Sequence, residues 1–441
     1  MYCGDDVEAV VGDVGSALSK FGLAGEDTPK LVVSSAVARK TAQEEPQGAA
    51  QYAVGELFAV RNAEVLRTMQ GCAVTDWEAM EQLWKYAFEC LYVDPKEHPV
   101  IASVPACFAT EAQMTAAQKD AEKYMEMMFE KFDVPCFYMA KDAALDAFAF
   151  GRSSALIAEV GAGGTRVVPV FDGYPLQRPS QFSTVGCDRL SEYLSHLVRS
   201  KEGTPEVRPR CCFSRKVNAH GKLETSLLPA DRITPPVMPT SYLEYMRSEV
   251  FRDMRECVST ISTKTLSDEK LQQQVAEEQR YELPDGQVIT LGKERFQVAE
   301  FLLHPRSFED TTSVVKTESS APSTTLSSHP QSLPKGLHRM LYDAVQLCDA
   351  DIRRDMLANI ILCGGGSLMT GLTERLHHEL TAMVPSSFKV RFTTGMKVER
   401  QFSCFIGGSI LASLGSFQQL WVSRREYDEV GAQRLCADRF L

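Results

Sequence analysis

Apolar residues recur along this chain with two different spacings, which predicts a fold that mixes strands and helices. Short apolar runs bounded by glycine, proline or aspartate are typical of buried strands, and longer stretches with an apolar residue every three or four positions are typical of amphipathic helices. Strands are predicted at residues 9–11, up to residue 21, at 31–33, 100–104, 135–139, 155–160, 167–171, 359–363 and 390–392, and on both sides of a turn at 284–286. Helices are predicted at residues 75–91, 115–132, 141–150, 188–200, 242–260, 337–350, 371–383, 407–422 and 424–430.

The clearest helical pattern covers residues 75–91. Thr75 is the expected N-cap, and Glu78 follows three residues later, as in a capping box. The apolar residues fall on one stripe, which favours a core-facing helix over a ligand-binding group of aromatic rings. This stripe consists of Trp77, Met80, Leu83, Trp84, Ala87, Phe88 and Leu91.

Three segments lack apolar periodicity. Residues 39–56 are polar and predict an exposed loop, and residues 201–239 are rich in proline and charge and predict an irregular excursion. Residues 309–334 are dominated by serine, threonine and proline, a composition typical of a solvated or disordered insert.

Two glycine-rich turns between strands, far apart in the sequence, are the most distinctive local feature. Either turn alone is most simply an ordinary β-hairpin. Two such loops that face each other, however, present backbone N–H groups to phosphate oxygens from both sides, because glycine lets the backbone approach closely. The pairing therefore favours a phosphate clamp. The turns contain Asp13, Gly15 and Ser16 in the first stretch and Gly161, Gly163 and Gly164 in the second.

A third glycine turn lies between a buried strand and a helix. The run Gly364-Gly365-Gly366-Ser367 follows the strand predicted at 359–363 and precedes the helix predicted at 371–383. Helix N-termini direct unpaired N–H groups toward such turns, so this is a further nucleotide-type loop.

Length, charge and cysteine content limit the kinds of protein that this chain can be. With 441 residues, 44% of them hydrophobic, the chain is expected to form two large lobes. Its net charge of −11 disfavours a general nucleic-acid-binding surface, so any association with DNA is expected to run through partners. The 13 cysteines lack zinc-site spacing and indicate free thiols in a reducing compartment. We find no signal peptide and no apolar run of the about 18 residues that a membrane-spanning helix needs, so a nuclear or cytosolic protein is expected.

The last part of the chain carries a specific resemblance. The sequence FIGGSILASLGSFQQLWVSRREYDE at 405–429 closely resembles the C-terminal signature of actins and actin-related proteins. The first glycine turn with Lys20 and residues 24–29 resembles the first phosphate loop of actin, and the central hairpin resembles the second. Gly364-Gly365 resembles the adenosine loop, and residues 252–256 resemble the helix whose Lys-Glu pair contacts the nucleoside. The resemblance covers the whole chain and is weakest at 38–60, 201–240 and 305–335.

Within this superfamily the chain most resembles the nuclear actin-related proteins. Residues 1–16, 281–296 and 398–403 carry this similarity. It implies a non-catalytic, nucleotide-binding structural subunit shared by chromatin remodelling and histone acetyltransferase complexes. It also implies a nuclear location, nuclear actin as a neighbour, a helical segment of a scaffold subunit as the common partner, and no contact with membranes.

The resemblance implies the α/β actin-like ATPase superfold, with two lobes divided into four subdomains around a nucleotide cleft. Subdomain 1 is expected to combine residues 1–37, 73–148 and 403–441, and subdomain 2 to be the small region 38–72. Subdomain 3 is expected at 149–187 and 277–402, with the insert at 309–334, and subdomain 4 at 188–276.

The resemblance also implies an ATP site. Asp13 and Glu159 would hold Mg²⁺ through water molecules. The residues that match the family's nucleotide-binding positions are Asp13, Gly15, Ser16, Lys20, Glu159, Gly161, Gly163, Gly164, Arg255, Glu256, Gly364, Gly365, Ser367 and Gln401.

Several positions depart from the actin pattern. Glu159 replaces an aspartate, Ala162 replaces a further aspartate, and Gln401 replaces a lysine beside the adenine. Asp142 stands where actin has the glutamine that orients water, and Arg166 stands where it has a histidine. These two residues either form an unremarkable surface or pocket-lining pair or face each other as an ion pair that blocks the water site. Because phosphoryl transfer depends on positioning, we expect slow hydrolysis or none, and no catalytic residue is assigned.

The insert at 309–334 lies where actin has an apolar plug that filaments use, and the loop at 39–56 is also altered. Both changes predict a monomer in isolation. A polymerising actin-like ATPase of the cytoskeleton is the main alternative, and a small-molecule kinase of the same superfold is a weaker one that the C-terminal signature disfavours.

A partner helix is expected in the groove between the two lower subdomains. This groove would lie near Gly151, Arg152, Tyr174 and residues 410–420. An apolar groove of this kind suits an amphipathic helix. Most of the apolar side chains in the last segment are expected to be core residues, so the prediction concerns the rim of the groove as a whole and not each residue. The expected core residues are Ile410, Leu411, Leu414 and Phe417.

Overall fold

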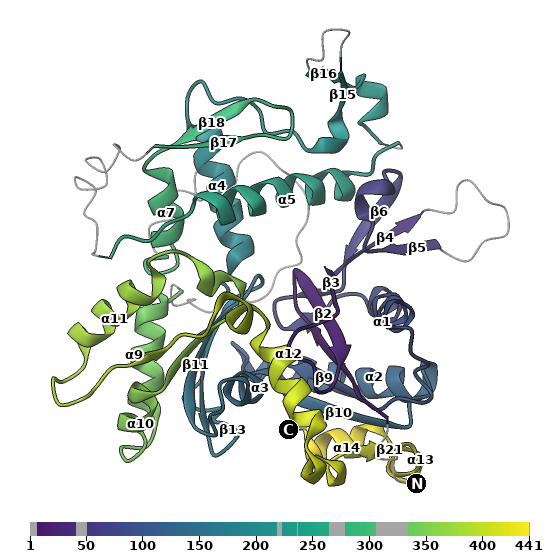
Figure 1. Ribbon diagram of the computed structural model, residues 1–441, viewed down its shortest axis with the longest axis vertical. Coiled ribbons are helices and arrows are strands. Elements are labelled where there is room, and N and C mark those ends of the chain that lie inside the picture. The colour runs from purple at the N-terminus through teal and green to yellow at the C-terminus, as the bar shows by residue number, and fades with distance from the viewer. Residues whose placement is uncertain are drawn as a thin grey trace.

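The computed structural model describes residues 7–40, 51–217, 223–235, 237–263, 278–305 and 334–440. Two large mixed sheets, each with helices on its faces, form the two lower parts of the molecule, and smaller elements lie above them (Figure 1). Most of the predicted loop at 39–56 and all but the last residue of the predicted insert at 309–334 lie outside the described residues.

The first sheet belongs to the N-terminal lobe and has the strand order β21-β10-β9-β1-β2-β3. Trp84 is fully buried beneath it, and a Cβ at Gly12 would lie 2.2 Å from the Trp84 ring, so only glycine allows this contact. The strands are β1 (Val10–Val14), β2 (Leu18–Leu23), β3 (Leu31–Ser34), β9 (Val100–Val104), β10 (Cys136–Lys141) and β21 (Val422–Ser423). The surrounding helices are α1 (Trp77–Leu91), α2 (Glu111–Glu126), α13 (Arg424–Val430) and α14 (Ala432–Arg439), and a short hairpin pairs β7 (Met69–Gln70) with β8 (Ala73–Val74).

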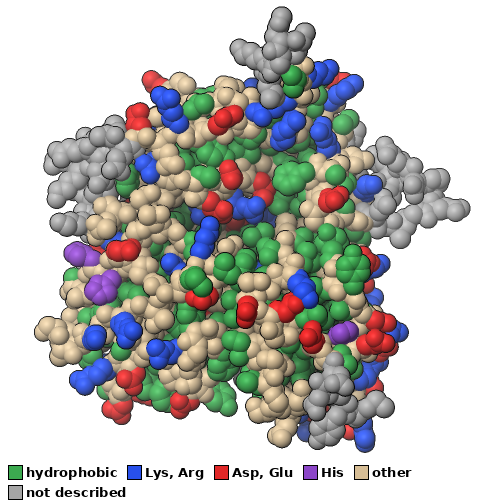
Figure 2. Space-filling view, viewed as in Figure 1, with side chains coloured by type: hydrophobic (Ala, Val, Ile, Leu, Met, Phe, Trp, Pro, Cys, Tyr) green, Lys and Arg blue, Asp and Glu red, His purple; other side chains and the backbone are tan. Residues whose placement is uncertain are grey.

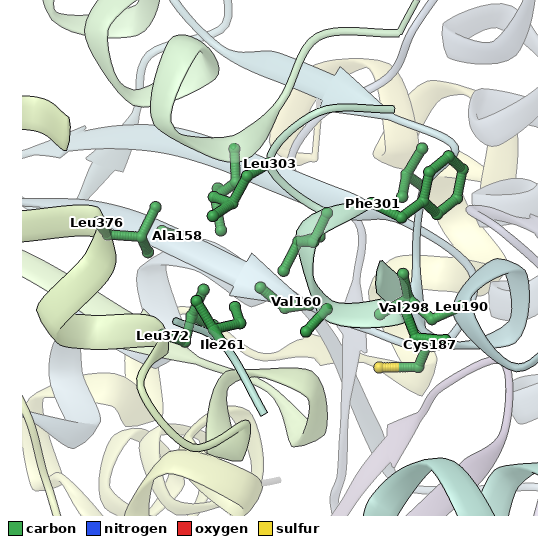
Figure 3. Packing of buried hydrophobic residues seen from close by; sticks show 14 of the residues in the cluster. Ala158, Val160, Cys187, Leu190, Ile261, Val298, Phe301, Leu303, Leu372 and Leu376 are labelled. Carbon is green, nitrogen blue, oxygen red and sulfur yellow. The ribbon is translucent and has the colours of Figure 1, made fainter. Parts of the chain in front are cut away.

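The second sheet has the order β13-β12-β11-β19-β20, and β14 also pairs with β12. In Figure 3, Ala158 and Val160 of its central strand lie among apolar side chains from helices and loops far away in the sequence, which form one continuous core. The strands are β11 (Ala155–Val160), β12 (Thr165–Phe171), β13 (Tyr174–Pro175), β14 (Gln181–Ser183), β19 (Ile360–Cys363) and β20 (Phe392–Thr393). The helices on this side are α9 (Leu337–Leu347), α10 (Arg353–Ala358) and α11 (Leu372–Met383).

Smaller elements complete the upper part of each lobe (Figure 1). A three-stranded sheet on one lobe consists of β4 (Ala36–Lys40), β5 (Gln51–Val54) and β6 (Ala63–Arg67). The other lobe carries α4 (Cys187–Ser200), α5 (Thr240–Val258), α7 (Glu294–Glu300) and the hairpins β15 (Phe213–Val217)–β16 (Leu223–Leu227) and β17 (Gln279–Glu282)–β18 (Val288–Leu291).

Two helices join the lobes at their base. The helix α3 (Asp142–Ala149) packs against α12 (Lys397–Ser413), and α12 also contacts strands of both large sheets. A Cβ at Gly407 would lie 1.9 Å from the carbonyl oxygen of Leu145, so this glycine sets the close approach of the two helices.

A second contact between the lobes lies above the cavity, and we call it the clasp. It is the apolar cluster that packs β4 and β6 against the N-terminal half of α5 and the 3₁₀ turn at Arg210–Cys212. Hydrogen bonds join Ser34 Oγ to Tyr245 Oη at 2.7 Å, and the backbone N–H of Val65 donates to Ser241 Oγ at 3.2 Å. An Arg67–Asp188 ion pair of 2.9 Å lies beside the cluster.

The structure corrects several expected boundaries. The N-cap of α1 is Asp76, whose carboxylate accepts from Ala79 N, while Thr75 Oγ1 donates to Arg67 O. The helix predicted at 115–132 begins at Glu111 and ends in a π-helical turn at Met127–Lys131. Residues 201–239 are not wholly irregular, because they contain the β15–β16 hairpin.

The helix predicted at 407–422 is also shifted. The helix α12 begins at Lys397, bends at Phe402 and ends at Ser413. The glycines at 407 and 408, which indicated a helix start, are buried packing residues in its middle. After α12 the backbone extends at Leu414 and forms a 3₁₀ turn at Gly415–Gln419 before β21.

Candidate functional site

A cavity of about 630 Å³ lies between the lobes, at the turns of the two large hairpins. This volume is within the range of about 300–1,000 Å³ typical of small-molecule sites. Figure 2 shows acidic and basic side chains gathered in a hollow at the middle of this face. The β1–β2 turn, the β11–β12 turn, the 364–366 turn and the C-terminal half of α5 form its walls.

The structure brings nearly all the predicted nucleotide-binding residues to this cavity. The exception is Ser367, which is fully buried and does not line it. The Ser367 backbone carbonyl instead accepts from the Arg400 guanidinium. The predicted residues that line the cavity are Asp13, Gly15, Ser16, Lys20, Glu159, Gly161, Gly163, Gly164, Arg255, Glu256, Gly364, Gly365 and Gln401.

The first hairpin places an acid and a base directly opposite each other. Asp13 of β1 pairs in register with Lys20 of β2, and Lys20 Nζ lies 2.8 Å from Asp13 Oδ2. Ser103 Oγ donates to the other carboxylate oxygen at 2.8 Å. Burial alone would raise the pKa of Asp13, but the charge and hydrogen bond of Lys20 lower it below its usual value. Asp13 in turn outweighs the effect of burial on Lys20 and raises the pKa of its ammonium group.

The glycines of the two hairpins allow the lobes to meet at the cavity. A Cβ at Gly163 would lie 2.5 Å from Ser16 Oγ and 2.8 Å from the Gly71 Cα atom, so a larger residue would push the turns apart. Ser16 Oγ donates to Gly71 O at 3.1 Å. Gly364 has φ of +81°, and a Cβ there would lie 2.6 Å from Val160 O. These positions therefore require glycine and leave backbone N–H groups accessible to a ligand.

Arg166 of the second hairpin forms ion pairs with two acids, Glu159 on the neighbouring strand and Asp142 at the start of α3. Arg166 pairs in register with Glu159, and its Nη2 atom lies 2.5 Å from Glu159 Oε2. Its Nη1 atom lies 2.5 Å from Asp142 Oδ2. The structure thus forms the Asp142–Arg166 ion pair, one of the two arrangements that the sequence left open. The contact of Arg166 with Glu159 was not predicted.

Both oxygen atoms of the Asp142 carboxylate are engaged. Asp142 Oδ1 accepts from the backbone N–H groups of Ala106 at 2.9 Å and Ala143 at 2.7 Å, and Oδ2 accepts from Arg166. Asp142 is also the first residue of α3, where the helix dipole favours a negative charge. Burial would lower the pKa of Arg166, but the two carboxylates raise it well above its usual value, so the guanidinium remains charged.

Sequence analysis missed Asp146, which lies one helical turn after Asp142. Its carboxyl group is buried and accepts from Ser403 Oγ at 2.6 Å and Cys363 Sγ at 3.2 Å. Burial and the nearby charge of Glu159 raise the pKa of Asp146 to about 8. The group is therefore mostly protonated at neutral pH. The four-residue spacing from Asp142 on a predicted helix is the signal that would have indicated it.

The helix α5 supplies the opposite wall. Arg255 is buried, donates from Nε to Ser191 Oγ at 3.1 Å and lies 3.0 Å from Glu256 Oε1. Ser259, just beyond the helix, was not predicted from the sequence. It lines the cavity, and its buried hydroxyl has no hydrogen-bond partner among the described residues. A polar ligand in the cavity can satisfy this hydroxyl, which fits the nucleoside part of a nucleotide.

The two carboxylates expected to hold a metal ion already have cationic partners in Lys20 and Arg166. Within the described parts of the chain, no group of three or more His, Cys, Asp or Glu side chains has the arrangement of a metal site. In those same parts, no helix combines the length and the apolar character that crossing a membrane requires.

Several of the apolar residues named for the predicted partner groove are exposed at the base of the molecule. Tyr174 is 76% exposed, and Ile410 and Leu414 are 40% and 46% exposed. Only Phe417 of the four expected core residues is fully buried, with its ring centroid 4.9 Å from that of Tyr138. Tyr174 is near enough to contribute, after burial, to the raised pKa of Tyr138.

Comparisons with known proteins agree with this architecture. The family model for actin matches residues 4–440. The chain is 34% identical to Actin-related protein 4 of Arabidopsis thaliana, over 99% of this chain and 100% of that protein. It is 35% identical to Actin-related protein 4 of Oryza sativa subsp. indica, over 99% and 100%, and 32% identical to Actin-related protein 4 of Schizosaccharomyces pombe, over 98% and 97%.

These similarities extend over nearly the full length of each chain, so they concern the whole fold and not one motif. The predicted α/β actin-like fold and the resemblance to actin-related proteins are confirmed. The chain belongs to the actin family.

Proposed function

We propose that this protein is a nucleotide-binding, non-catalytic structural subunit of nuclear chromatin remodelling and histone acetyltransferase complexes. One observation carries the nucleotide part of the proposal: glycine turns that suit phosphate line the same cavity as Asp142, whose two carboxylate oxygens are both engaged by donors of the chain itself. The family and its similarity to Actin-related protein 4 support the structural role.

The residues that line the cavity fit ATP. Lys20 and the N–H groups of the three glycine turns would hold the phosphates, because charged donors and close backbone approach suit phosphate oxygens. Ser259, Arg255 and Glu256 would contact the nucleoside, and Gln401 lies at the same cavity. ATP would supply a polyphosphate that both lobes bind.

The same geometry disfavours hydrolysis. A residue that orients the attacking water needs a free acceptor within hydrogen-bond reach of that water. Asp142 stands at the position expected for this role, but two backbone N–H groups and Arg166 occupy its carboxylate. A polymerising ATPase would need a side chain that orients the attacking water, and Asp142 is not free for this role. We therefore propose slow turnover or none.

The exposed rim at the base supports the proposed partner. Tyr174, Ile410 and Leu414 are exposed apolar side chains, as expected for a site that receives an amphipathic helix. We propose that a helical scaffold segment binds here beside nuclear actin, and that the isolated chain is a monomer.

Four measurements test this function. Thermal unfolding with and without millimolar ATP should show stabilisation by ligand linkage, and a turnover assay should show little phosphate release. Sedimentation in Mg²⁺-ATP should leave the chain in the supernatant.

Affinity purification from nuclei should recover actin and chromatin-complex subunits. Replacing the exposed Leu414 by Asp should remove these partners while the stabilisation by ATP stays. Turnover at actin-like rates, or recovery without chromatin subunits, would contradict the proposal.

A further inference from the structure

The two carboxylates that a metal ion would need are both neutralised from within the chain. Each belongs to a hairpin, and in each hairpin the neutralising cation is the residue directly across the ladder: Lys20 for Asp13 and Arg166 for Glu159. The contact distances are 2.8 Å and 2.5 Å. A cross-strand partner is tethered beside the acid, so a hydrated ion competes with a cation that is always present.

At the second hairpin this competition favours Arg166 over a metal ion. A guanidinium offers donors in a fixed fork, and here the two outer nitrogens contact two different acids. Asp142 is itself anchored by two backbone N–H groups, so the fork cannot turn away without leaving a carboxylate unpaired. The Arg166 side chain is only 17% exposed, which limits screening of its charge by water.

A divalent cation would have to share this space with the guanidinium. Mg²⁺ and Ca²⁺ bind through several oxygen ligands, from carboxylates, carbonyls and water, that are free to face the ion. Arg166 already takes one oxygen of Glu159 and one of Asp142, and Lys20 takes one of Asp13. The donor set therefore does not fit the metal that an actin-type site is expected to hold.

The basic side chains at the cavity balance the acidic ones without an added ion. Six basic and six acidic side chains of the described residues line it, and one of the acidic ones, Asp146, is mostly protonated at neutral pH. The basic residues are Lys20, Arg166, Arg252, Arg255, Lys397 and Arg400, and the acidic ones are Asp13, Asp142, Asp146, Glu159, Asp188 and Glu256.

We propose that this chain binds a nucleoside triphosphate without a divalent cation, and that the Arg166 guanidinium takes the electrostatic place of the metal ion. The inference rests on the proposed nucleotide binding and specifies its cofactor requirement. It implies that chelation of divalent ions does not release the nucleotide from the site.

The first experiment compares two thermal shifts of the full-length chain, freed of nucleotide. ATP is added at millimolar concentration with excess EDTA in one series and with excess Mg²⁺ in the other. We expect the same rise in melting temperature in both. A shift that appears only with Mg²⁺ would overturn this inference and leave the proposed nucleotide binding intact. The absence of any shift would overturn both.

The second experiment creates a metal requirement. In Arg166→Ala, Asp142 and Glu159 lose their shared cation, so three acidic side chains remain near the phosphate site with Lys20 alone. We expect the ATP shift to disappear in EDTA and to return with Mg²⁺. The matched control is Arg39→Ala, which removes another in-register Arg–Glu pair, Arg39–Glu64 at 3.1 Å, outside the cavity. The control should keep equal shifts. Equal shifts in Arg166→Ala would overturn the inference.

A direct measurement covers the case in which Arg166→Ala does not fold. The wild-type chain is loaded with ATP and Mn²⁺, desalted and assayed for both. We expect nucleotide to remain with the protein and Mn²⁺ to be lost. Retention of one Mn²⁺ for each nucleotide would overturn the inference.

Discussion

The two hairpins at the cavity share one layout but differ in the freedom of their cations. In each, an acid and a base seven residues apart face each other across the ladder, Asp13 with Lys20 and Glu159 with Arg166. Lys20 is a single charge on a flexible stem and can turn from its aspartate to a phosphate oxygen. Arg166 bridges two acids and cannot leave either without exposing a buried charge. The cation of the first hairpin is thus free to move toward a ligand, whereas the cation of the second is fixed between two acids.

Removal of Arg166 should have the largest effect on stability. Arg166→Ala leaves Asp142 and Glu159 without their cation, and breaking a buried ion pair in this way costs about 3 kcal/mol. Urea unfolding at pH 7 should show this loss, and it should shrink at pH 5, where the unpaired carboxylates can take up protons. If Lys20→Ala were equally costly, the difference between the hairpins would not hold.

The close contact between the two turns gives the next prediction. In Gly163→Ala the new Cβ would meet Ser16 Oγ and the Gly71 backbone, so we expect a loss of about 2 kcal/mol, as for overpacked sites, and a weaker ATP shift. Gly365→Ala is the comparison, because a Cβ there meets no heavy atom within 4 Å. Its melting temperature should match that of the parent chain, and a large fall would show that backbone freedom matters more than space.

The protonated state of Asp146 predicts a dependence of stability on pH. Its pKa is about 8 in the folded chain, above the ordinary value of 3.8, so the folded state binds the extra proton between these pH values. Stability should therefore fall as pH rises through this window and level off above pH 8. Asp146→Asn removes this contribution. Denaturant unfolding from pH 5 to 9 should give a flatter profile for the variant, and identical profiles would contradict the assignment.

The smallest effect is expected at a third cross-strand pair, Arg39 with Glu64. Both side chains are substantially exposed, 35% and 40%, so solvent screens their attraction. Arg39→Ala should lower the free energy of unfolding by less than about 1 kcal/mol. Both arginines face a glutamate across a ladder, but only Arg166 is largely buried. Urea unfolding of the two variants therefore shows how much of the free energy of an ion pair comes from burial. A loss as large as that of Arg166→Ala would mean that register alone sets the energy.

The sequence predicted the parts of the site that depend on local chemistry. The glycine turns follow from residue type and spacing, and the structure places them at one cavity. The contact of Arg166 with Glu159 depends on strand register, which neither residue specifies alone. The pKa of Asp146 is raised by burial among residues that are distant in the chain, and the hydrogen bond from Ser403, 257 residues away, only partly offsets this rise. Both are tertiary effects, beyond the reach of local patterns.

The same division explains the errors in the fold. The amphipathic helix at 75–91 was placed to within two residues, because its apolar period is strong. The β15–β16 hairpin was missed because its strands, rich in polar and charged residues, lack the alternation of a half-buried sheet. The glycines at 407 and 408 were interpreted as a helix start, since the sequence alone does not reveal that α3 packs against them.

The clasp has a consequence for how fast any ligand leaves the cavity. The first turns of α5 hold the β4–β6 sheet through Tyr242 and Tyr245, and its last turns carry Arg255 to the cavity wall. A rotation that widens the cavity about the α3–α12 contact must therefore pull α5 from this sheet, where the lever arm is longest. The clasp would therefore slow the opening through which a molecule enters or leaves the cavity.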